Sequence, residues 1–192
     1  MPLIGDGTAQ AIHSFAIAHA WLTPVVVVAT AVCIALCPLA LVILWIRDRT
    51  LRAAVATLLG LTVADKLCRY LGQLQYVQRP FVALHFTPLF PHTNNNSFPS
   101  STVAFAAVVA SIVLLAWRPA GVVLAIGTVI IAVGCVYVGV HYIEDVIVGA
   151  VLGIACGAVF WFALGPPPVG RFLGAIEERL PGARFTTPRT HR

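Results

Sequence analysis

Five long apolar segments limit the folds open to this chain more than any other feature of its sequence. They cover about residues 22–46, 53–77, 101–117, 121–140 and 143–164. A helix needs roughly 17–25 residues to cross the hydrocarbon of a bilayer, so each segment lies within or near this range and the third is marginal. Charged residues make up only 10% of the 192 residues, against roughly a quarter in a soluble domain. We therefore expect an all-α integral membrane bundle of about five transmembrane helices, forming a single domain over residues 1–192.

The two ends of the chain are expected to lie outside the bilayer. Residues 8–20 (TAQAIHSFAIAHA) are too few to span it and include two histidines, which favours an amphipathic helix at the membrane interface. No basic stretch opens the chain and Asp6 comes early, so we do not expect a signal peptide. Three prolines at 166–168 end the last apolar segment. Residues 166–192 are expected to form a short cytoplasmic tail, with a surface helix over 170–180.

The basic residues predict how the bundle is oriented. Nine of the twelve lie on one side of the predicted helices: Arg47, Arg49, Arg52, Arg118, Arg171, Arg179, Arg184, Arg189 and Arg192. The positive-inside rule makes this side cytoplasmic. The net charge of +5 thus follows from topology and does not indicate a nucleic-acid partner. We expect a multi-pass protein of the cell (inner) membrane, in which residues 78–100 and the link near residue 141 face the periplasm or the cell exterior.

His141 and Asp145 are the strongest candidates for catalytic residues. Their spacing of four places them one above the other on a helix. A carboxylate there can hold one ring nitrogen and leave the other free and basic, which is how a histidine becomes a nucleophile. The alternative is an interfacial histidine that only hydrogen-bonds the acid. Gly149, Gly153 and Gly157 continue the face of Asp145, and such a stripe lets another helix approach closely, so both side chains are expected to face the bundle interior.

Arg79 and a run of hydroxyl residues are expected to bind an anion at the same surface. Arg79 precedes the helix-breaking Pro80, and its guanidinium can bind two phosphate oxygens at once; the alternative is an arginine that reaches lipid headgroups. Ser100, Ser101 and Thr102 stand where the third segment begins. Free N–H groups and the helix dipole favour an anion there, and the alternative is a helix cap without a ligand.

Three charged residues lie deeper, near the middle of the second segment: Asp65, Lys66 and Arg69. Charges at this depth cost several kcal/mol unless they are paired or face a cavity. Asp65 is expected to pair with a base. Lys66 and Arg69 either extend the positive field toward the site as auxiliary residues or pair for structural reasons alone. The five cysteines lie in apolar segments without metal-ligand spacing, so we expect them to pack as small apolar residues, and we expect neither a metal nor a cofactor.

These residues resemble the motifs of the type 2 phosphatidic acid phosphatase superfamily. The segment RPFVALHFTPLFPHTNNNSFPSS is similar to the loop of the bacitracin-resistance type of undecaprenyl-diphosphate phosphatase. The resemblance runs over about 65–157, roughly half the chain, and implies a phosphatase-like core at about 53–165. The Arg-Pro pair at 79–80 matches the end of the first motif, and Pro-Ser-Ser-Thr at 99–102 stands in the second. VYVGVHYIEDV supplies the histidine and aspartate of the third motif.

The resemblance implies a mechanism and a membrane fold. His141 attacks phosphorus and forms a phosphohistidine, while Asp145 orients the imidazole. Two arginines, a lysine and the second-motif backbone hold the phosphoryl oxygens. A second-motif histidine protonates the leaving oxygen, and water then releases phosphate.

The sequence departs from the family pattern at three positions. Thr102 replaces the second-motif histidine, Cys135 the third-motif arginine and Gly72 the first-motif lysine. A missing general acid typically costs about 10²–10⁴-fold in rate. The loss is more tolerable for a diphosphate, which releases a lipid monophosphate, than for a monoester, which releases a basic alkoxide. His85 and His92 lie in the outer loop; either one of them supplies the missing proton, or both are interfacial loop histidines.

Three functions remain open at this point, and the first two belong to different classes. The first is a membrane lipid phosphatase that hydrolyses a polyprenyl (undecaprenyl) diphosphate to the monophosphate at the outer face, through a histidine nucleophile. The second is a catalytically impaired member of the family that binds or transports a polyprenyl phosphate or another anionic lipid. A phosphotransferase built on the same nucleophile is a third. In each case the partner is a polyprenyl phosphate or other phospholipid held in the bilayer.

Overall fold

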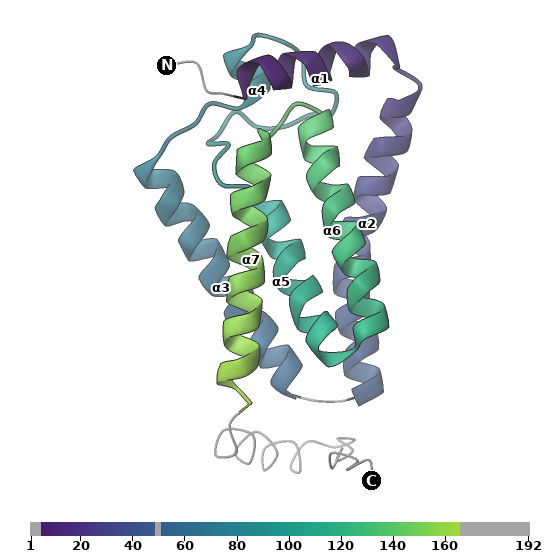
Figure 1. Ribbon diagram of the computed structural model, residues 1–192, viewed down its shortest axis with the longest axis vertical. Coiled ribbons are helices and arrows are strands. Elements are labelled where there is room, and N and C mark those ends of the chain that lie inside the picture. Colours follow the sequence, from purple (N-terminus) through teal and green to yellow (C-terminus); the bar gives the residue numbers. More distant parts are fainter. Residues whose placement is uncertain (1–4, 49–50, 166–192) are drawn as a thin grey trace.

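The computed structural model describes residues 5–48 and 51–165, and this part of the chain contains helices and no strands. Five long helices run side by side (Figure 1): α2 (Leu22–Asp48), α3 (Leu51–Leu74), α5 (Ser101–Ala116), α6 (Arg118–Tyr137) and α7 (Ile143–Ala163). Two shorter ones lie at one end of the bundle: α1 (Asp6–Ala18) and α4 (Pro80–Ala83). Each predicted apolar segment forms a helix within a few residues of its expected bounds, which confirms the all-α fold. The predicted tail lies outside the described residues.

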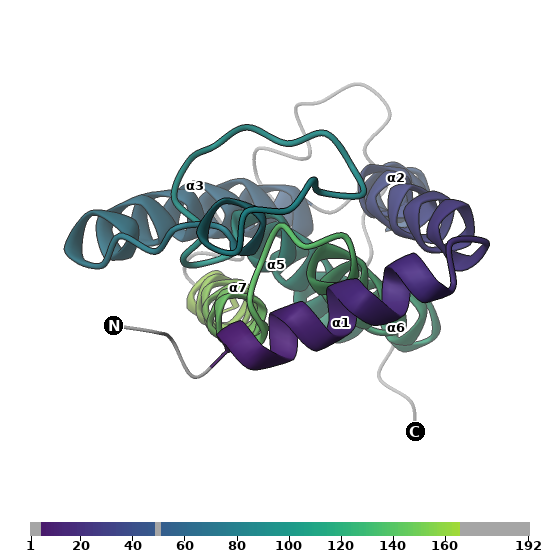
Figure 2. The same cartoon turned by 90° about the horizontal axis from the view of Figure 1, so that it is seen from above.

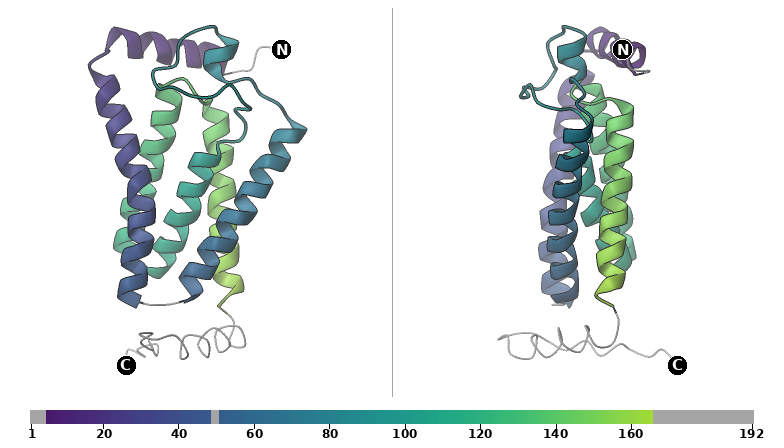
Figure 3. Two further views of the ribbon diagram at one scale, coloured as in Figure 1. Left: turned by 180° about the vertical axis from the view of Figure 1, so that it is seen from behind. Right: turned by 90° about the vertical axis from the view of Figure 1, so that its left-hand side faces the viewer.

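The helix α5 forms the centre of the bundle. It packs against α7, α6 and α3, while α2 packs mainly against α6 (Figure 3). Its side chains Val103, Val108 and Ile112 are fully buried. The outward faces of the surrounding helices are also apolar, and their side chains are exposed. A bundle that is apolar both in its core and on its surface is typical of a protein surrounded by lipid.

The glycine stripe of α7 determines how closely α5 and α7 approach. A Cβ added at Gly149 would collide with the backbone oxygen of Ser100, and one added at Gly153 would collide with the backbone oxygen of Ala104. The prediction of a close helix contact at this stripe is therefore confirmed. The contact places the N-terminal end of α7, with Asp145, directly against the N-terminal end of α5.

The helix α1 crosses one end of the bundle instead of running along it (Figure 2). Asp6 at its start accepts a hydrogen bond of 2.9 Å from the hydroxyl of Tyr142, and the ring of His13 stacks on Phe86 with 3.8 Å between centroids. The predicted helix at 8–20 thus exists with bounds two residues earlier. It contacts the link between α6 and α7 through Tyr142 and the loop after α4 through Phe86.

Among the described residues, three helices are long and apolar enough to cross a membrane: Leu22–Ile46 within α2, α6 and α7. The helix α5 is a shorter apolar helix, and α3 exposes Lys66 and Arg69 in its second half. A total of five spans therefore stays a prediction. The sequence predicts that Asp65 pairs with a base, and the structure shows that this base is Arg69. The Nε of Arg69 lies 2.8 Å from the Asp65 carboxylate, one helical turn away.

Candidate active site

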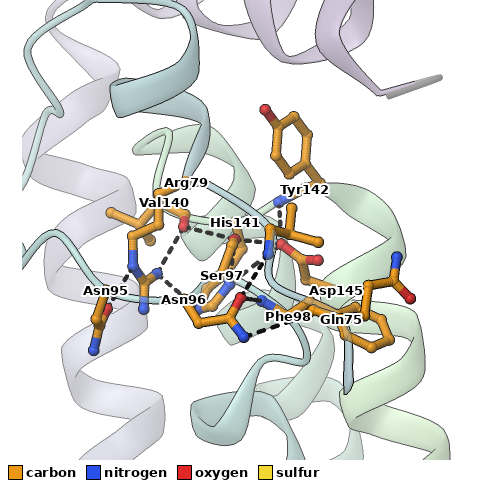
Figure 4. A network of polar contacts seen from close by, with 11 residues as sticks. Gln75, Arg79, Asn95, Asn96, Ser97, Phe98, Val140, His141, Tyr142 and Asp145 are labelled. Carbon is orange, nitrogen blue, oxygen red and sulfur yellow. Dashed lines mark hydrogen bonds and ion pairs between the residues drawn. The ribbon is translucent and has the colours of Figure 1, made fainter. Parts of the chain in front are cut away.

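Three chain segments meet at the end of the bundle beneath α1 (Figure 4). Arg79 directly precedes α4, whose first residue Pro80 fixes the start of that short helix. Ser97 belongs to the loop between α4 and α5, and His141 to the link between α6 and α7. The starts of α3 and α6, which carry Arg52 and Arg118, lie at the opposite end of the bundle. For these two described residues, the expected separation of the motifs from the basic loops is present in the fold.

His141 is held by a chain of polar contacts through Ser97. The Ser97 hydroxyl donates a 2.5 Å hydrogen bond to Oδ2 of Asp145 and lies 3.3 Å from Nδ1 of His141. The direct distance from Nδ1 to Oδ2 is 3.6 Å, which is too long for a hydrogen bond. Ser97 uses its proton on the carboxylate, so it accepts from Nδ1–H. This arrangement leaves Nε2 of His141 as the basic nitrogen.

Arg79 lies against that basic nitrogen. Its Nη1 donates to the backbone oxygen of Val140 at 2.7 Å and is 3.3 Å from Nε2 of His141. Its Nε donates to the side-chain oxygen of Asn95 at 2.8 Å. The side chain is only 5% exposed. Arginine stays charged even when burial lowers its pKa, as it does here, so a fixed positive charge lies beside the candidate nucleophile.

Asp145 also has a structural role at the start of α7. Its Oδ2 accepts a 2.9 Å hydrogen bond from the backbone N–H of Tyr142, the residue that precedes the helix. Its backbone oxygen accepts from the N–H of Ser100 at 3.0 Å. One carboxylate therefore caps α7 and anchors the chain that orients His141. This couples the position of the imidazole to the contact between α5 and α7.

Burial keeps His141 in its neutral form. The residue is 4% exposed, and burial is the largest cause that lowers the pKa of His141. The nearby carboxylate of Asp145 raises this pKa, whereas the charges of Arg79 and His92 lower it further. The net direction is downward, because an imidazolium would lose its hydration beside a fixed guanidinium. A neutral imidazole is the form that can act as a nucleophile.

A cavity of about 210 Å³ opens beside His141 between α2, α6 and the α4–α5 loop. Several of the positions singled out from the sequence line it, namely His92, Thr102, Cys135 and His141. Apolar residues of α2 and α6 complete the wall. We call this cavity the site cavity. It brings together two of the three positions where the sequence departs from the family pattern.

The third departure has a physical explanation in the packing around Gly72. A Cβ at Gly72 would lie 2.8 Å from Nδ2 of Asn96, which donates a 2.7 Å hydrogen bond to the Gly72 oxygen. The same amide accepts from the N–H groups of Val77 and Phe98 at 2.9 and 3.1 Å. Asn96 thus fills the space where a longer side chain would begin, and it ties α3 to the loop before α5.

The remaining candidate residues lie elsewhere. Ser101 and Arg69 line a separate, more open pocket of about 440 Å³ on the α3 side. Lys66 and His85 are exposed and line neither of these cavities. Ser100 is buried with no partner for its hydroxyl among the described atoms. No group of three or more histidine, cysteine or acidic side chains that could hold a metal occurs in residues 5–48 and 51–165.

The site also contains residues that sequence reasoning missed. Ser97, Asn95 and Asn96 form the hydrogen bonds that position His141, Arg79 and the loop. In the sequence they belong to a polar run, NNNS, that is indistinguishable from an ordinary surface loop. Only the burial of Ser97, which is completely inaccessible to solvent, separates it from its neighbours.

Comparison with known proteins agrees with the geometry. The PAP2 superfamily matches residues 49–165. Undecaprenyl-diphosphatase BcrC of Bacillus subtilis (strain 168) is 30% identical over 154 residues, which is 79% of this chain and 80% of the relative. Bacitracin transport permease protein BcrC of Bacillus licheniformis is 28% identical over 129 residues, 65% and 64% of the two chains.

Two solved structures share the fold. LpxE of Aquifex aeolicus superposes with a TM-score of 0.67 at 24% identity, over 83% of this chain and 95% of that one. A PAP2-type phosphatidylglycerolphosphate phosphatase from Bacillus subtilis gives a TM-score of 0.62 at 21% identity, over 93% and 88%. At these identities the likeness concerns the fold alone. The match over more than half of the sequence shows that this chain belongs to the PAP2 superfamily of lipid phosphatases.

Proposed function

We propose that this protein hydrolyses a polyprenyl diphosphate of the undecaprenyl class to the monophosphate, at the outer face of the cell membrane, with His141 as the nucleophile. The observation that carries the proposal is the chain from His141 through Ser97 to Asp145, with Arg79 beside the basic nitrogen. It combines an oriented, neutral imidazole with a cation that can hold the oxygens of a phosphoryl group. The relative named undecaprenyl-diphosphatase supports the choice of substrate.

In the proposed reaction each buried residue has one role. Nε2 of His141 attacks the terminal phosphorus, and the bond to the lipid monophosphate breaks. Asp145, through Ser97, stabilises the positive charge that develops on the imidazole. Arg79 holds the phosphoryl oxygens, together with the first backbone N–H groups of α5 at Ser101 and Thr102, for which no side chain provides a cap. Water then hydrolyses the phosphohistidine.

A continuous apolar groove supports a lipid substrate. The site cavity shares Ile34 and Thr102 with a second cavity of about 320 Å³. The second cavity in turn shares Leu41 and Leu61 with a third of about 280 Å³. The three follow α2 away from His141, and the second and third are lined almost entirely by apolar side chains. A hydrocarbon chain lying in this groove would bring its headgroup to the site.

A second candidate function rests on the family residues that are missing. Cys135 and Thr102 line the site cavity where the family pattern has an arginine and a histidine, and Asn96 fills the space beside Gly72. A chain without these groups can still bind the lipid phosphate through Arg79. The second candidate is therefore a member that binds or transports a polyprenyl phosphate, and one relative is named a transport permease protein.

The test is phosphate release from undecaprenyl diphosphate by the purified protein in detergent. We expect His141→Ala to abolish release, because no other described side chain is oriented as a nucleophile beside Arg79. Glu144→Gln is the matched control, since Glu144 is exposed and lies only three residues away. It is expected to retain full activity. Labelling with a substrate carrying radioactive terminal phosphate should trap an acid-labile adduct in the wild type.

The two functions predict different results in this assay. Release that persists in His141→Ala, with thermal stability preserved, removes the nucleophile assignment. Wild-type release no greater than that of the variant, together with saturable binding of undecaprenyl phosphate that Arg79→Ala weakens, supports the binding function instead.

A further inference from the structure

The proposed hydrolysis leaves one proton unassigned. When the bond to the leaving oxygen breaks, that oxygen takes the electron pair and needs a proton or another source of charge stabilisation. Thr102 stands where the family pattern places the histidine that supplies it, and a threonine hydroxyl does not release a proton near neutral pH. The structure contains a different acid at the same cavity.

His92 and Thr102 line the site cavity together with His141. His92 reaches this place because the α4–α5 loop is hydrogen-bonded to the segment that follows α6. There the N–H of Leu89 donates a 3.2 Å hydrogen bond to the backbone oxygen of Val138, and Phe90, two residues before His92, joins the wall of the same cavity.

The orientation of the His92 ring is set by its own backbone. Nδ1 lies 3.1 Å from the backbone oxygen of Thr93. A carbonyl oxygen only accepts, so Nδ1 carries a hydrogen and Nε2 is the nitrogen that exchanges a proton. The side chain is exposed, so water can reach the ring.

We propose that His92 is the general acid of this site, and that it replaces the second-motif histidine lost at Thr102. The inference rests on the proposed phosphatase function and deepens it. It makes the catalytic set of this chain His141, Asp145, Arg79 and His92, drawn from three segments.

The proton balance closes with His92 in this role. Nε2 of His141 forms a bond to the terminal phosphorus, the bond between that phosphorus and the bridging oxygen breaks, and the imidazolium of His92 donates its Nε2 proton to the departing lipid monophosphate. Neutral His92 then takes a proton from water as the water oxygen attacks the phosphohistidine. Phosphate leaves, and both histidines return to their starting forms.

The other titratable groups near the site do not fit this role. His85 is exposed, has a positive φ of 54° and does not line the site cavity. Arg79 is engaged with Val140 and Asn95 and does not release a proton near neutral pH. Cys135 lines the cavity, but it lies within α6 and is buried. Among the titratable side chains that line the site cavity, this leaves His92 as the acid.

The experiment compares His92→Asn with His85→Asn in full-length protein. Both variants remove one imidazole from the same loop, and asparagine tolerates the positive φ at residue 85. With undecaprenyl diphosphate we expect His92→Asn to lower kcat by about 10²-fold or more and to remove the basic limb of the pH profile of kcat. His85→Asn is expected to stay within about twofold of the wild type. The double variant His92→Asn, Thr102→His should regain at least about tenfold over His92→Asn, because it restores the family acid.

Several outcomes would overturn the inference. Release that depends on His141 but is unchanged in His92→Asn leaves the proposed function intact and removes His92 as the acid. Equal losses of kcat in the two asparagine variants, with no recovery in the double variant, mean that both substitutions disturb the structure of the loop and that His92 is not the acid. Release that does not depend on His141 removes the proposed function itself, and the role of His92 with it.

Discussion

At the scale of single residues, the orientation of one imidazole depends on a serine. Asp145 is too far from Nδ1 of His141 for a direct hydrogen bond, and Ser97 lies between them. A spacing of four residues predicts that the acid and the histidine are neighbours. It does not predict that Ser97, which belongs to the α4–α5 loop, lies between the imidazole of His141 and the carboxylate of Asp145.

This arrangement makes Ser97→Ala a sharp test. The variant leaves the buried Nδ1–H of His141 without its acceptor, and an unsatisfied buried donor costs about 1–3 kcal/mol. We expect kcat for undecaprenyl diphosphate to fall by about ten- to a hundredfold, since each 1.4 kcal/mol corresponds to about tenfold, with a smaller change in KM. Asn94→Ala, at an exposed position in the same loop, is the control. An unchanged kcat in Ser97→Ala would mean that Asp145 moves to hold the imidazole directly.

At the scale of helices, the contact between α5 and α7 connects stability to the site. The glycines of α7 allow the backbone of α5 to approach, and the same contact aligns Asp145 with the N–H of Ser100. A small-residue stripe is readable from the sequence as a close contact. The identity of the opposite helix is not, because any of the other long helices could have packed there.

A single methyl group tests this contact. In Gly153→Ala the new Cβ would collide with the Ala104 backbone oxygen and lie 2.7 Å from the Cβ of Ala107. We expect a destabilisation of about 1–3 kcal/mol, seen as a lower Tm in detergent. Gly7→Ala is the control, because nothing lies within 4 Å of a Cβ there and alanine favours a helix. A Tm for Gly153→Ala equal to that of Gly7→Ala would contradict the close contact.

At the scale of the whole molecule, the fold separates a polar end from a basic end. The helix α4, which Arg79 precedes, and the link that carries His141 lie at the end that α1 crosses, whereas α3 and α6 begin at the other end with Arg52 and Arg118 in their first turns (Figure 1). The positive-inside rule predicts that the basic end is cytoplasmic. The site would then face outward, where a lipid diphosphate could be hydrolysed on the outer leaflet.

Cysteine labelling in intact cells tests this orientation. Four of the five native cysteines are buried and all are free thiols, so background labelling should be low. We expect Asn94→Cys to react with a membrane-impermeant maleimide in intact cells, and Arg118→Cys to react only after permeabilisation. Both positions are exposed. Labelling of Arg118→Cys in intact cells, with Asn94→Cys labelled only after permeabilisation, would mean that the site faces the cytoplasm.

The helices and their approximate bounds could be predicted from the sequence alone, and so could a set of candidate residues for a phosphate site. Those properties are local, because apolar runs, helix-breaking prolines and spacings of four act within one segment. Three contacts could not be predicted in this way: Ser97 lies between His141 and Asp145, Asn96 fills the space beside Gly72, and His92 rather than His85 lines the site cavity. The physical reason is that each of these contacts joins segments from different helices or loops, so it depends on how the helices pack and not on any pattern along the chain.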